Sequence, residues 1–238
     1  LTFHFSDYNI RMLKCVFLTP IADGITGNLV PNYLRLQSWA DKNNCAILTC
    51  HRLFLNFARN FLATGGKGFV DTSPPDAEWL FWIDSDVNFT IEQVEHLLSI
   101  GDEHKFVTGW YRSNYSDQAM VGNWDEDFFR KNHHMPFTSV KWLEKMGGEE
   151  PNKLVEVDWC GFGFTKIHRS IFEQMEYPYF PLNHADIDEC DKNGGGKFHL
   201  KDLTFEDVSF CQNCYKTTGV KPLVVPSIRL PHYKSFFV

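Results

Sequence analysis

Residues Trp79–Val87 read WLFWIDSDV, and this stretch decides the fold because five large apolar residues end abruptly in two carboxylates. A short apolar run of this kind predicts a strand buried on both faces, as in the centre of a parallel sheet. Ligands of open α/β sheets bind at the carboxyl ends of strands. Two crowded carboxylates there are unfavourable unless a cation or a proton neutralises them. We therefore expect a divalent-metal or acid/base site at Asp84 and Asp86.

The composition indicates one α/β domain of ordinary size, because 238 residues with 43% apolar content can bury a substantial core. Aromatic residues make up 16% of the chain, and they either line a cleft for flat or sugar-like ligands or simply fill the core. The net charge of −7 comes from dispersed charges. Without a basic face the chain is not expected to bind nucleic acid.

The cysteine count and the N-terminus bear on the compartment. Seven cysteines, an odd number, do not suggest a disulfide framework, so we expect a reducing, cytoplasmic location. Neither a transmembrane run nor a signal peptide is recognisable. Met12 directly precedes the first predicted strand. Residues 1–11 are therefore expected to be an N-terminal extension, and residues 12–238 the domain.

Two strand-helix units precede the central stretch. The pattern predicts strands over 14–20 and 45–49, each followed by a helix, over 29–41 and 51–64. The loop after the first strand contains neither a dinucleotide-binding glycine pattern nor a P-loop. Arg59 lies on the second helix, where it is either a site residue or a solvated helix charge.

The pattern after the central stretch is less regular. Thr90 with Gln93 predicts an N-cap that opens a helix to Ser99, and a strand ending in aromatics is expected over 106–111. Residues 112–151 are expected to form short strands and loops in a lobe over the sheet. A single glycine-containing strand is predicted over 155–167, followed by a helix over 168–175.

The last third of the chain contains a long polar stretch, a helix and a strand. Residues 183–202 predict a functional loop or disorder. The next helix opens with Glu206 and Asp207, which are either site residues or acidic residues that complement the helix dipole. A final buried strand is expected over 220–225, and His232 lies just beyond it.

Four features therefore follow one another in a definite order: Asp84-x-Asp86 after a buried strand, Asp158-Trp159-x-Gly161-x-Gly163, the pair Glu206-Asp207, and a late His232. Together they resemble the nucleotide-sugar glycosyltransferases of the GT-A fold over about residues 13–234. The sequence is also similar to the N-terminal glycosyltransferase domain of chlorella-virus enzymes that build capsid glycans. The resemblance implies a GT-A-like single domain with a mostly parallel central sheet, flanking helices and a smaller acceptor-side lobe.

The resemblance also assigns residues to the donor nucleotide sugar. Thr19 and Pro20 match contacts to the base or ribose, and Arg59 matches a base or phosphate contact. Ser85, within the D-x-D motif, belongs to the same donor set. An Arg/Lys-rich diphosphate clamp is missing, so Lys234 is expected to help the metal neutralise the diphosphate.

The D-x-D motif of the family binds a divalent metal that bridges the donor diphosphate. Asp84 matches the first carboxylate, which meets the ribose or a metal-bound water, and Asp86 matches the direct metal ligand. His232 matches the late histidine that completes the coordination. Carboxylates with one imidazole suit Mn²⁺, with Mg²⁺ also acceptable.

The resemblance also implies inverting transfer, and it assigns the remaining site residues. The acceptor hydroxyl must lose a proton as it attacks the sugar, and Asp207 is the expected base, with Glu206 holding a hydroxyl. Sequence alone leaves open which of the two faces the sugar. Asp158, Trp159 and the Gly161–Gly163 backbone are expected to contact the acceptor or the donor sugar, unless Trp159 belongs to the core.

The expected activity is transfer from a nucleoside-diphosphate sugar, with UDP favoured and guanine open, to a hydroxyl of a glycan or glycoprotein. If the chain is viral, this would occur in the host cytoplasm. A haloacid-dehalogenase-like phosphatase would instead use Asp84 as a nucleophile. A sugar-phosphate nucleotidyltransferase lacks its expected glycine-rich loop here. A non-catalytic carbohydrate-binding domain would bind glycans without turnover.

Overall fold

The computed structural model describes residues 12–21, 24–25, 27–51, 54–113, 117–132, 134–190, 197–203 and 205–233. For residues 184–190 and 197–203 it describes the backbone alone. The expected N-terminal extension, residues 1–11, and Lys234 lie outside the described residues.

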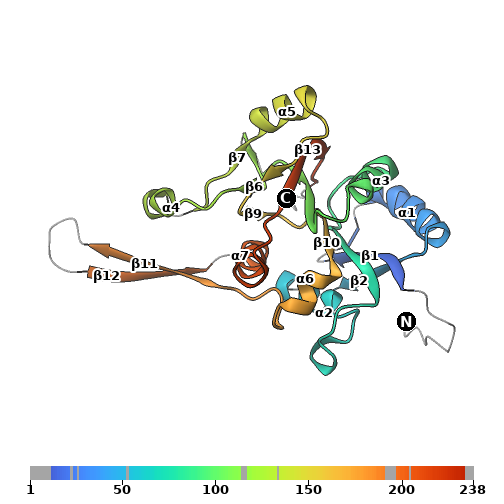
Figure 1. The fold of residues 1–238 in the computed structure, drawn as a ribbon, viewed down its shortest axis with the longest axis horizontal. Coiled ribbons are helices and arrows are strands. Elements are labelled where there is room, and N and C mark those ends of the chain that lie inside the picture. Colours follow the sequence, from blue (N-terminus) through green and yellow to red (C-terminus); the bar gives the residue numbers. More distant parts are fainter. Residues whose placement is uncertain are drawn as a thin grey trace.

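A seven-stranded sheet forms the centre of the fold (Figure 1). In spatial order its strands are β2 (Cys45–His51), β1 (Leu13–Ile21), β3 (Ala77–Ile83), β10 (Phe164–His168), β4 (Phe106–Tyr111), β13 (Leu223–Leu230) and β8 (Val155–Glu156). Only β10 and β8 pair antiparallel to their neighbours, so the other five strands run in one direction. The predicted mostly parallel sheet is confirmed.

Strand β3 is buried on both sides of the sheet, as its apolar run predicts. Leu80 and Trp82 belong to one hydrophobic core, and Trp79, Phe81 and Ile83 belong to the other. This alternation follows from the two-residue period of a strand. The strand therefore needs apolar residues at every position, and the first polar residue, Asp84, stands where it ends.

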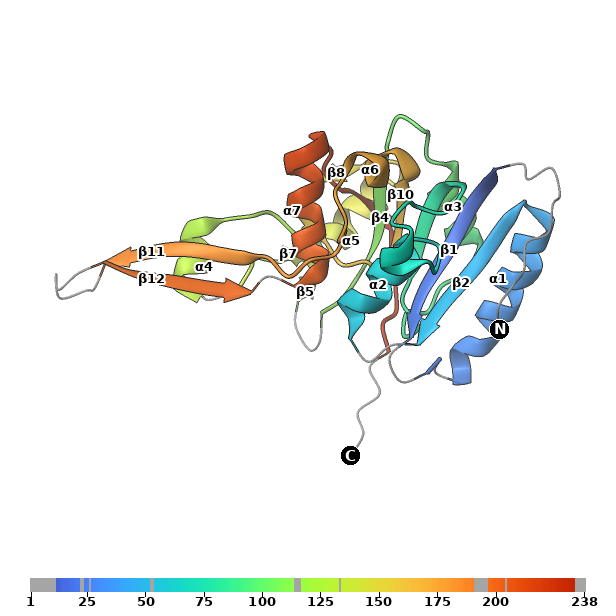
Figure 2. The same ribbon diagram turned by 90° about the horizontal axis from the view of Figure 1, so that it is seen from below.

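Helices cover both faces of the sheet (Figures 1 and 2). The first core contains side chains from α2 (Leu55–Ala63), α6 (Arg169–Gln174) and α7 (Glu206–Thr218). The second contains side chains from α1 (Val30–Lys42) and α3 (Ile91–Ser99). Thr90 and Gln93 form the predicted capping box at the start of α3. Short 3-10 turns, η1 (Gly27–Leu29) and η2 (Gly68–Val70), precede α1 and follow α2.

The predicted lobe of short strands and loops also contains two helices. Its elements are β5 (Gln118–Ala119), β6 (Val121–Gly122), α4 (Glu126–Asn132), β7 (Thr138–Ser139), α5 (Val140–Glu149) and β9 (Trp159–Cys160). Helix α5 forms because Ser139 caps it and Val140 and Leu143 are buried. Gly147 lies within α5, where its missing side chain leaves room for the Pro226 carbonyl.

The prediction of one strand over 155–167 is wrong. The segment divides into β8, β9 and β10, each of which pairs with a different partner strand. Gly161 begins the break before β10, where the chain turns at Phe162 and Gly163. The alternation of apolar residues that is typical of strands continues through the breaks between β8, β9 and β10. It therefore does not reveal where one strand ends and the next begins.

Within the polar stretch 183–202, the described backbone forms two paired strands, where the sequence predicted a functional loop or disorder. Strand β11 (His184–Cys190) pairs antiparallel with β12 (Lys197–Leu203). Figures 1 and 2 both show the hairpin projecting away from the central sheet. It leaves the body between α6 and α7, so the chain returns from it directly into the helix that begins with Glu206.

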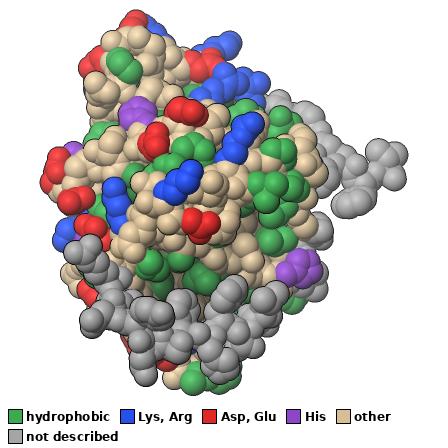
Figure 3. Space-filling model, turned by 90° about the vertical axis from the view of Figure 1, so that its right-hand side faces the viewer, with side chains coloured by type: hydrophobic (Ala, Val, Ile, Leu, Met, Phe, Trp, Pro, Cys, Tyr) green, Lys and Arg blue, Asp and Glu red, His purple; other side chains and the backbone are tan. Residues whose placement is uncertain are grey.

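On the face drawn in Figure 3, acidic and basic side chains are interspersed, and neither kind forms a large patch. Within the described ranges, no helix is both long enough and apolar enough to cross a bilayer.

Candidate active site

The two carboxylates lie in a tight turn at the carboxyl end of β3. The Asp84 N–H donates to the Gly163 carbonyl at 3.1 Å, and the Val87 N–H donates to the Asp84 carbonyl at 3.1 Å. The Tyr33 hydroxyl of α1 donates to the same Asp84 carbonyl at 3.2 Å. Backbone bonds therefore fix the turn from both sides, independently of any ligand.

A segment from the C-terminal end of the described chain runs beside this turn. The Tyr233 N–H donates to the Asp86 carbonyl at 2.8 Å, and Val87 and His232 form an antiparallel bridge. His232 Nε2 consequently lies 3.1 Å from Asp86 Oδ2. The Tyr111 ring packs against the imidazole with ring centroids 4.8 Å apart. The structure thus brings together Asp86 and His232, which are 146 residues apart.

Asp86 and His232 are partly exposed, with 39% and 13% of their side chains accessible to solvent. One carboxylate and one imidazole suit Mn²⁺, and such an ion keeps positions for substrate phosphates and water. No group of three His, Cys, Asp or Glu side chains that could hold a metal occurs among the described residues. At this edge the described residues thus supply two candidate ligands, Asp86 and His232, and a metal held here would need further ligands from elsewhere.

Asp84 faces a different partner, the guanidinium of Arg59. Arg59 Nη2 donates to both carboxylate oxygens of Asp84, at 3.0 and 3.1 Å, and Nε donates to Glu206 at 3.2 Å. The guanidinium lies 5.5 Å from the Trp82 ring and 5.4 Å from the Phe162 ring. Only 1% of Arg59 is exposed, so it is not a solvated helix charge.

The buried charges shift one another's pKa values. Burial alone would lower the pKa of Arg59, but Asp84, Glu206 and Asp207 together raise it above its usual value. Burial raises the pKa of Asp84, and Arg59 partly offsets this. Burial and the neighbouring Glu206 raise the pKa of Asp207 to about 7, against the lowering effect of Arg59. Three carboxylates facing one guanidinium favour the retention of a proton near neutral pH, and Asp207 is the residue placed to hold it.

The other predicted donor residues lie close to this edge of the sheet. Thr19 and Pro20 are buried in β1, the strand that pairs with β3. Ser85 lies half-buried in the turn between the two aspartates. Both residues are buried, so the structure does not expose either of them to a ligand.

The predicted acceptor residues Asp158 and Trp159 have structural partners. Trp159 is 2% exposed and packs edge-on against Phe137, so its place is the core of the lobe. Asp158 accepts from the Trp124 N–H at 2.8 Å and pairs with Lys221 at 2.9 Å. The alternative reading of Trp159 as a core residue is the one that fits this placement.

Gly161 and Gly163 make room for a tyrosine. A Cβ atom at Gly161 would overlap the Tyr111 hydroxyl, and one at Gly163 would lie 2.6 Å from the Tyr111 ring. Burial and the nearby Asp84 and Asp207 raise the pKa of the Tyr111 hydroxyl. Sequence reasoning did not single out Tyr111, although the aromatic end of its strand placed it at this edge.

We expect Gly163→Ala to lower the free energy of unfolding by about 1–3 kcal/mol, because the added methyl group overlaps the buried Tyr111 ring. Gly148→Ala is the matched control. A Cβ at Gly148 meets nothing within 4 Å in α5, so this change should be neutral or stabilise by up to about 1 kcal/mol. Urea denaturation of both variants measures the difference, and equal stabilities would contradict the packing argument.

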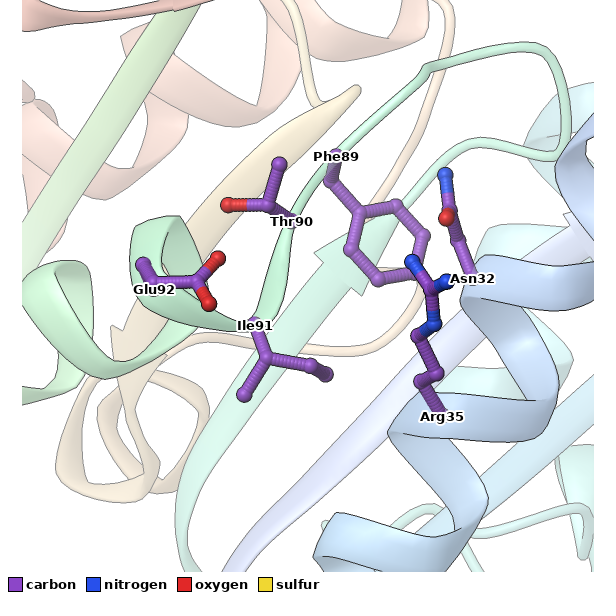
Figure 4. A pocket seen from close by; sticks show the side chains of 6 residues that line it. All are labelled: Asn32, Arg35, Phe89, Thr90, Ile91 and Glu92. Atoms are coloured by element: carbon purple, nitrogen blue, oxygen red, sulfur yellow. The ribbon is translucent and has the colours of Figure 1, made fainter.

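A separate hollow of about 250 Å³ lies between α1 and the start of α3 (Figure 4). Asn32 and Arg35 of α1 face Phe89–Glu92, and the capping box already uses the Thr90 hydroxyl. We name the buried network of Arg59, Asp84, Glu206 and Asp207 the acidic centre. None of its residues lines this hollow.

Comparison with known proteins gives structural matches alone. The sequence matches no protein-family model and no curated protein. Among solved structures, A197 from STIV is 17% identical, with a TM-score of 0.55, over 94% of this chain and 87% of that one. A glycosyltransferase involved in the glycosylation of the major capsid of PBCV-1 is 14% identical, with a TM-score of 0.32, over 67% of this chain and 62% of that one.

The likeness to A197 extends over nearly the whole of both chains and shows a common fold. The expected fold class is confirmed: a GT-A-like α/β domain with a mostly parallel central sheet flanked by helices.

Proposed function

We propose that this protein is a metal-dependent glycosyltransferase that moves a sugar from a nucleoside-diphosphate sugar to a hydroxyl of a glycan or glycoprotein. UDP is the favoured nucleotide, and transfer proceeds with inversion. The observation that carries the proposal is the position of two different groups at one sheet edge. The partly exposed pair Asp86 and His232 lies beside a buried network that contains Asp207. The pKa of Asp207 is raised to about 7.

Asp86 and His232 would hold Mn²⁺, or Mg²⁺, together with the donor diphosphate. Such an ion supplies a Lewis acid that stabilises the negative charge on a leaving nucleoside diphosphate. Asp84 shares this edge, but Arg59 holds both of its oxygens. In the proposal Asp84 accepts a hydrogen bond from a ribose hydroxyl or from a metal-bound water, as the resemblance implies. Arg59 keeps the Asp84 carboxylate ionised.

Asp207 is the proposed base that takes the proton of the acceptor hydroxyl. A base works best when its pKa is close to the working pH, and the raised pKa of Asp207 meets this condition. Glu206 is held by Arg59 and therefore serves to orient the network and a sugar hydroxyl. We therefore propose Asp207, and not Glu206, as the base.

The nucleotide is proposed to bind along the carboxyl ends of β1 and β3, beside Thr19, Pro20 and Ser85. In parallel sheets ligands bind at this edge. Lys234 would add a positive charge to the diphosphate site, but it lies outside the described residues.

The contacts of Asp84 disfavour the phosphatase alternative. A phosphatase of that class needs a free carboxylate oxygen as nucleophile. Both oxygens of Asp84 accept from Arg59, which lowers their nucleophilicity. A carbohydrate-binding domain would leave the buried network around Asp207 without a role.

The proposal is tested by metal-dependent nucleotide binding. We expect UDP, or GDP, to raise the melting temperature in the presence of Mn²⁺ and to have little effect when EDTA removes the metal. Asp86→Ala should abolish the metal-dependent part, because it removes the exposed carboxylate ligand. Asp41→Ala, an exposed change on α1, is the control for charge. A panel of nucleotides without any Mn²⁺-dependent shift would refute the proposal.

A further inference from the structure

Tyr111 is a buried residue of the candidate site to which the proposed function gives no role. It is the last residue of β4, and 5% of it is exposed. Its hydroxyl and its ring occupy the space that Cβ atoms at Gly161 and Gly163 would take. The Asp84 N–H donates to the Gly163 carbonyl, so the Tyr111 ring packs on the residue that anchors the turn of the two aspartates.

The Tyr111 hydroxyl has no hydrogen-bond partner among the described residues. A phenol keeps its proton at neutral pH and can donate one hydrogen bond. Buried polar groups without a partner are unfavourable, and native proteins contain few of them. Arg59 Nη1, in the acidic centre, is a second buried donor without an acceptor in the described part of the chain. The Tyr111 hydroxyl is therefore available to donate to an oxygen of a ligand.

Tyr111 extends between the two parts of the candidate site. Its ring packs against the His232 imidazole, with ring centroids 4.8 Å apart. The charges of Asp84 and Asp207 both act on its hydroxyl, which places the hydroxyl beside the acidic centre. In the proposed inverting transfer, the diphosphate lies at Asp86 and His232, and the base lies on the opposite side of the transferred sugar. The transferred sugar and the Tyr111 hydroxyl therefore occupy the same interval.

The neighbouring carboxylates limit the kind of group that can meet this hydroxyl. Asp84 and Asp207 would repel a phosphate oxygen whenever they are ionised. A sugar hydroxyl avoids this repulsion, because it accepts from Tyr111 and can donate to a carboxylate. The acceptor hydroxyl is a poor match, since a donated hydrogen bond withdraws electron density from the oxygen that must attack. The hydroxyls of the transferred sugar do not react, so they can hold this hydrogen bond throughout.

We propose that the Tyr111 hydroxyl donates a hydrogen bond to a hydroxyl of the transferred sugar, and that Tyr111 thereby selects the donor by its sugar. This inference rests on the proposed glycosyltransferase function and adds a donor-sugar contact to it. Because the nucleotide binds along β1 and β3 in that proposal, only an intact nucleotide sugar makes the contact with Tyr111.

The test compares nucleoside diphosphates with intact nucleotide sugars in the presence of Mn²⁺. Isothermal titration calorimetry measures the affinities of the full chain for UDP, GDP, UDP-glucose, UDP-galactose, UDP-N-acetylglucosamine and GDP-mannose. Tyr111→Phe should weaken the binding of the best-bound nucleotide sugar by about two- to tenfold, which corresponds to one hydrogen bond. Its affinity for the matching nucleoside diphosphate should equal that of the wild-type protein.

Phenylalanine retains the ring that packs against His232, so Tyr111→Phe tests the hydroxyl alone. Because this hydroxyl has no partner in the described chain, its removal should not lower the melting temperature. Tyr179→Phe is the matched control, since the Tyr179 hydroxyl donates to the Thr72 carbonyl at 2.6 Å. The control should lower the melting temperature and leave nucleotide-sugar binding unchanged. Equal losses of stability in the two variants would overturn the inference, because the Tyr111 hydroxyl would then have a partner within the protein.

The outcomes separate this inference from the function on which it rests. If neither UDP nor GDP binds the wild-type protein in a Mn²⁺-dependent way, the proposed function fails, and the sugar contact fails with it. If a nucleotide binds with Mn²⁺ and Tyr111→Phe retains the wild-type affinity for every nucleotide sugar, the sugar contact alone fails.

Discussion

Replacing Asp207 by asparagine is expected to reduce the rate of sugar transfer, or of donor hydrolysis by water, by about 10²- to 10⁴-fold. The amide has nearly the same shape but takes no proton at neutral pH, so the acceptor oxygen keeps its proton as it attacks. Nucleotide binding should persist, because Asp207 lies in the buried network and outside the Asp86–His232 pair. Release of nucleoside diphosphate from a panel of nucleotide sugars measures the rate.

Asp158→Asn is the matched control, since it removes a carboxylate that pairs with Lys221 away from the acidic centre. It should retain most of the activity. An Asp207→Asn protein with wild-type turnover would exclude Asp207 as the base and direct attention to Glu206.

The pKa of Asp207 also predicts the shape of the pH dependence. Because a base must be deprotonated, kcat/KM should fall on the acidic side with a midpoint near pH 7. Glu206→Gln should move this midpoint lower, because the Glu206 charge is one of the two main causes of the raised pKa. Carbon NMR of the Asp207 carboxyl group reads the same pKa without turnover, and a midpoint near the usual value for aspartate would contradict the prediction.

Replacing Arg59 by methionine is expected to lower the free energy of unfolding by about 3–5 kcal/mol. Methionine fills a similar volume between Trp82 and Phe162, but it leaves Asp84 and Glu206 without their shared counter-charge. Arg130→Met on α4 is the control, because its pair with Glu126 is partly exposed and should contribute less than about 1 kcal/mol. Urea denaturation measures both variants.

The Arg59→Met effect should grow with pH. In the native protein the pKa of Asp207 lies above its ordinary 3.8, so its contribution to stability is full below that value and is lost as the pH rises through about 7. Arg59 lowers the pKa values of both Asp84 and Asp207, so its removal raises them further. The variant should therefore lose more stability at about pH 8 than at about pH 5.

A double variant isolates the ion pairs from other effects of Arg59. Adding Glu206→Gln to Arg59→Met removes one uncompensated charge, so the double variant should recover part of the lost stability. Additive losses in the two single variants would mean that Arg59 acts through packing against the rings and not through its charge.

Some elements were predictable because neighbouring residues determine them. The apolar run Trp79–Ile83 forms β3, and Thr90 with Gln93 forms the capping box of α3, since a strand buried on both faces and a helix start each depend on a few adjacent side chains. The segment 155–167 was mispredicted because its breaks depend on partner strands elsewhere in the chain.

The candidate site divides in the same way. The residue types of Asp84 and Asp86 indicated a site at the end of a strand, and the resemblance added Asp207 and His232 to it. The placement of Trp159 in the core did not follow from its position between an acidic residue and a glycine, because its burial depends on Phe137 in the lobe.

The residues of WLFWIDSDV are enough to predict a buried strand whose carboxylates need a cation or a proton, because apolar pattern and charge are local properties. Which side chain lies beside each carboxylate depends on the three-dimensional fold. Arg59, 25 residues before Asp84 and 147 before Glu206, neutralises the buried pair, and His232 adjoins the exposed Asp86. Counter-charge and desolvation depend on segments that are distant in the chain, and folding alone brings these segments together.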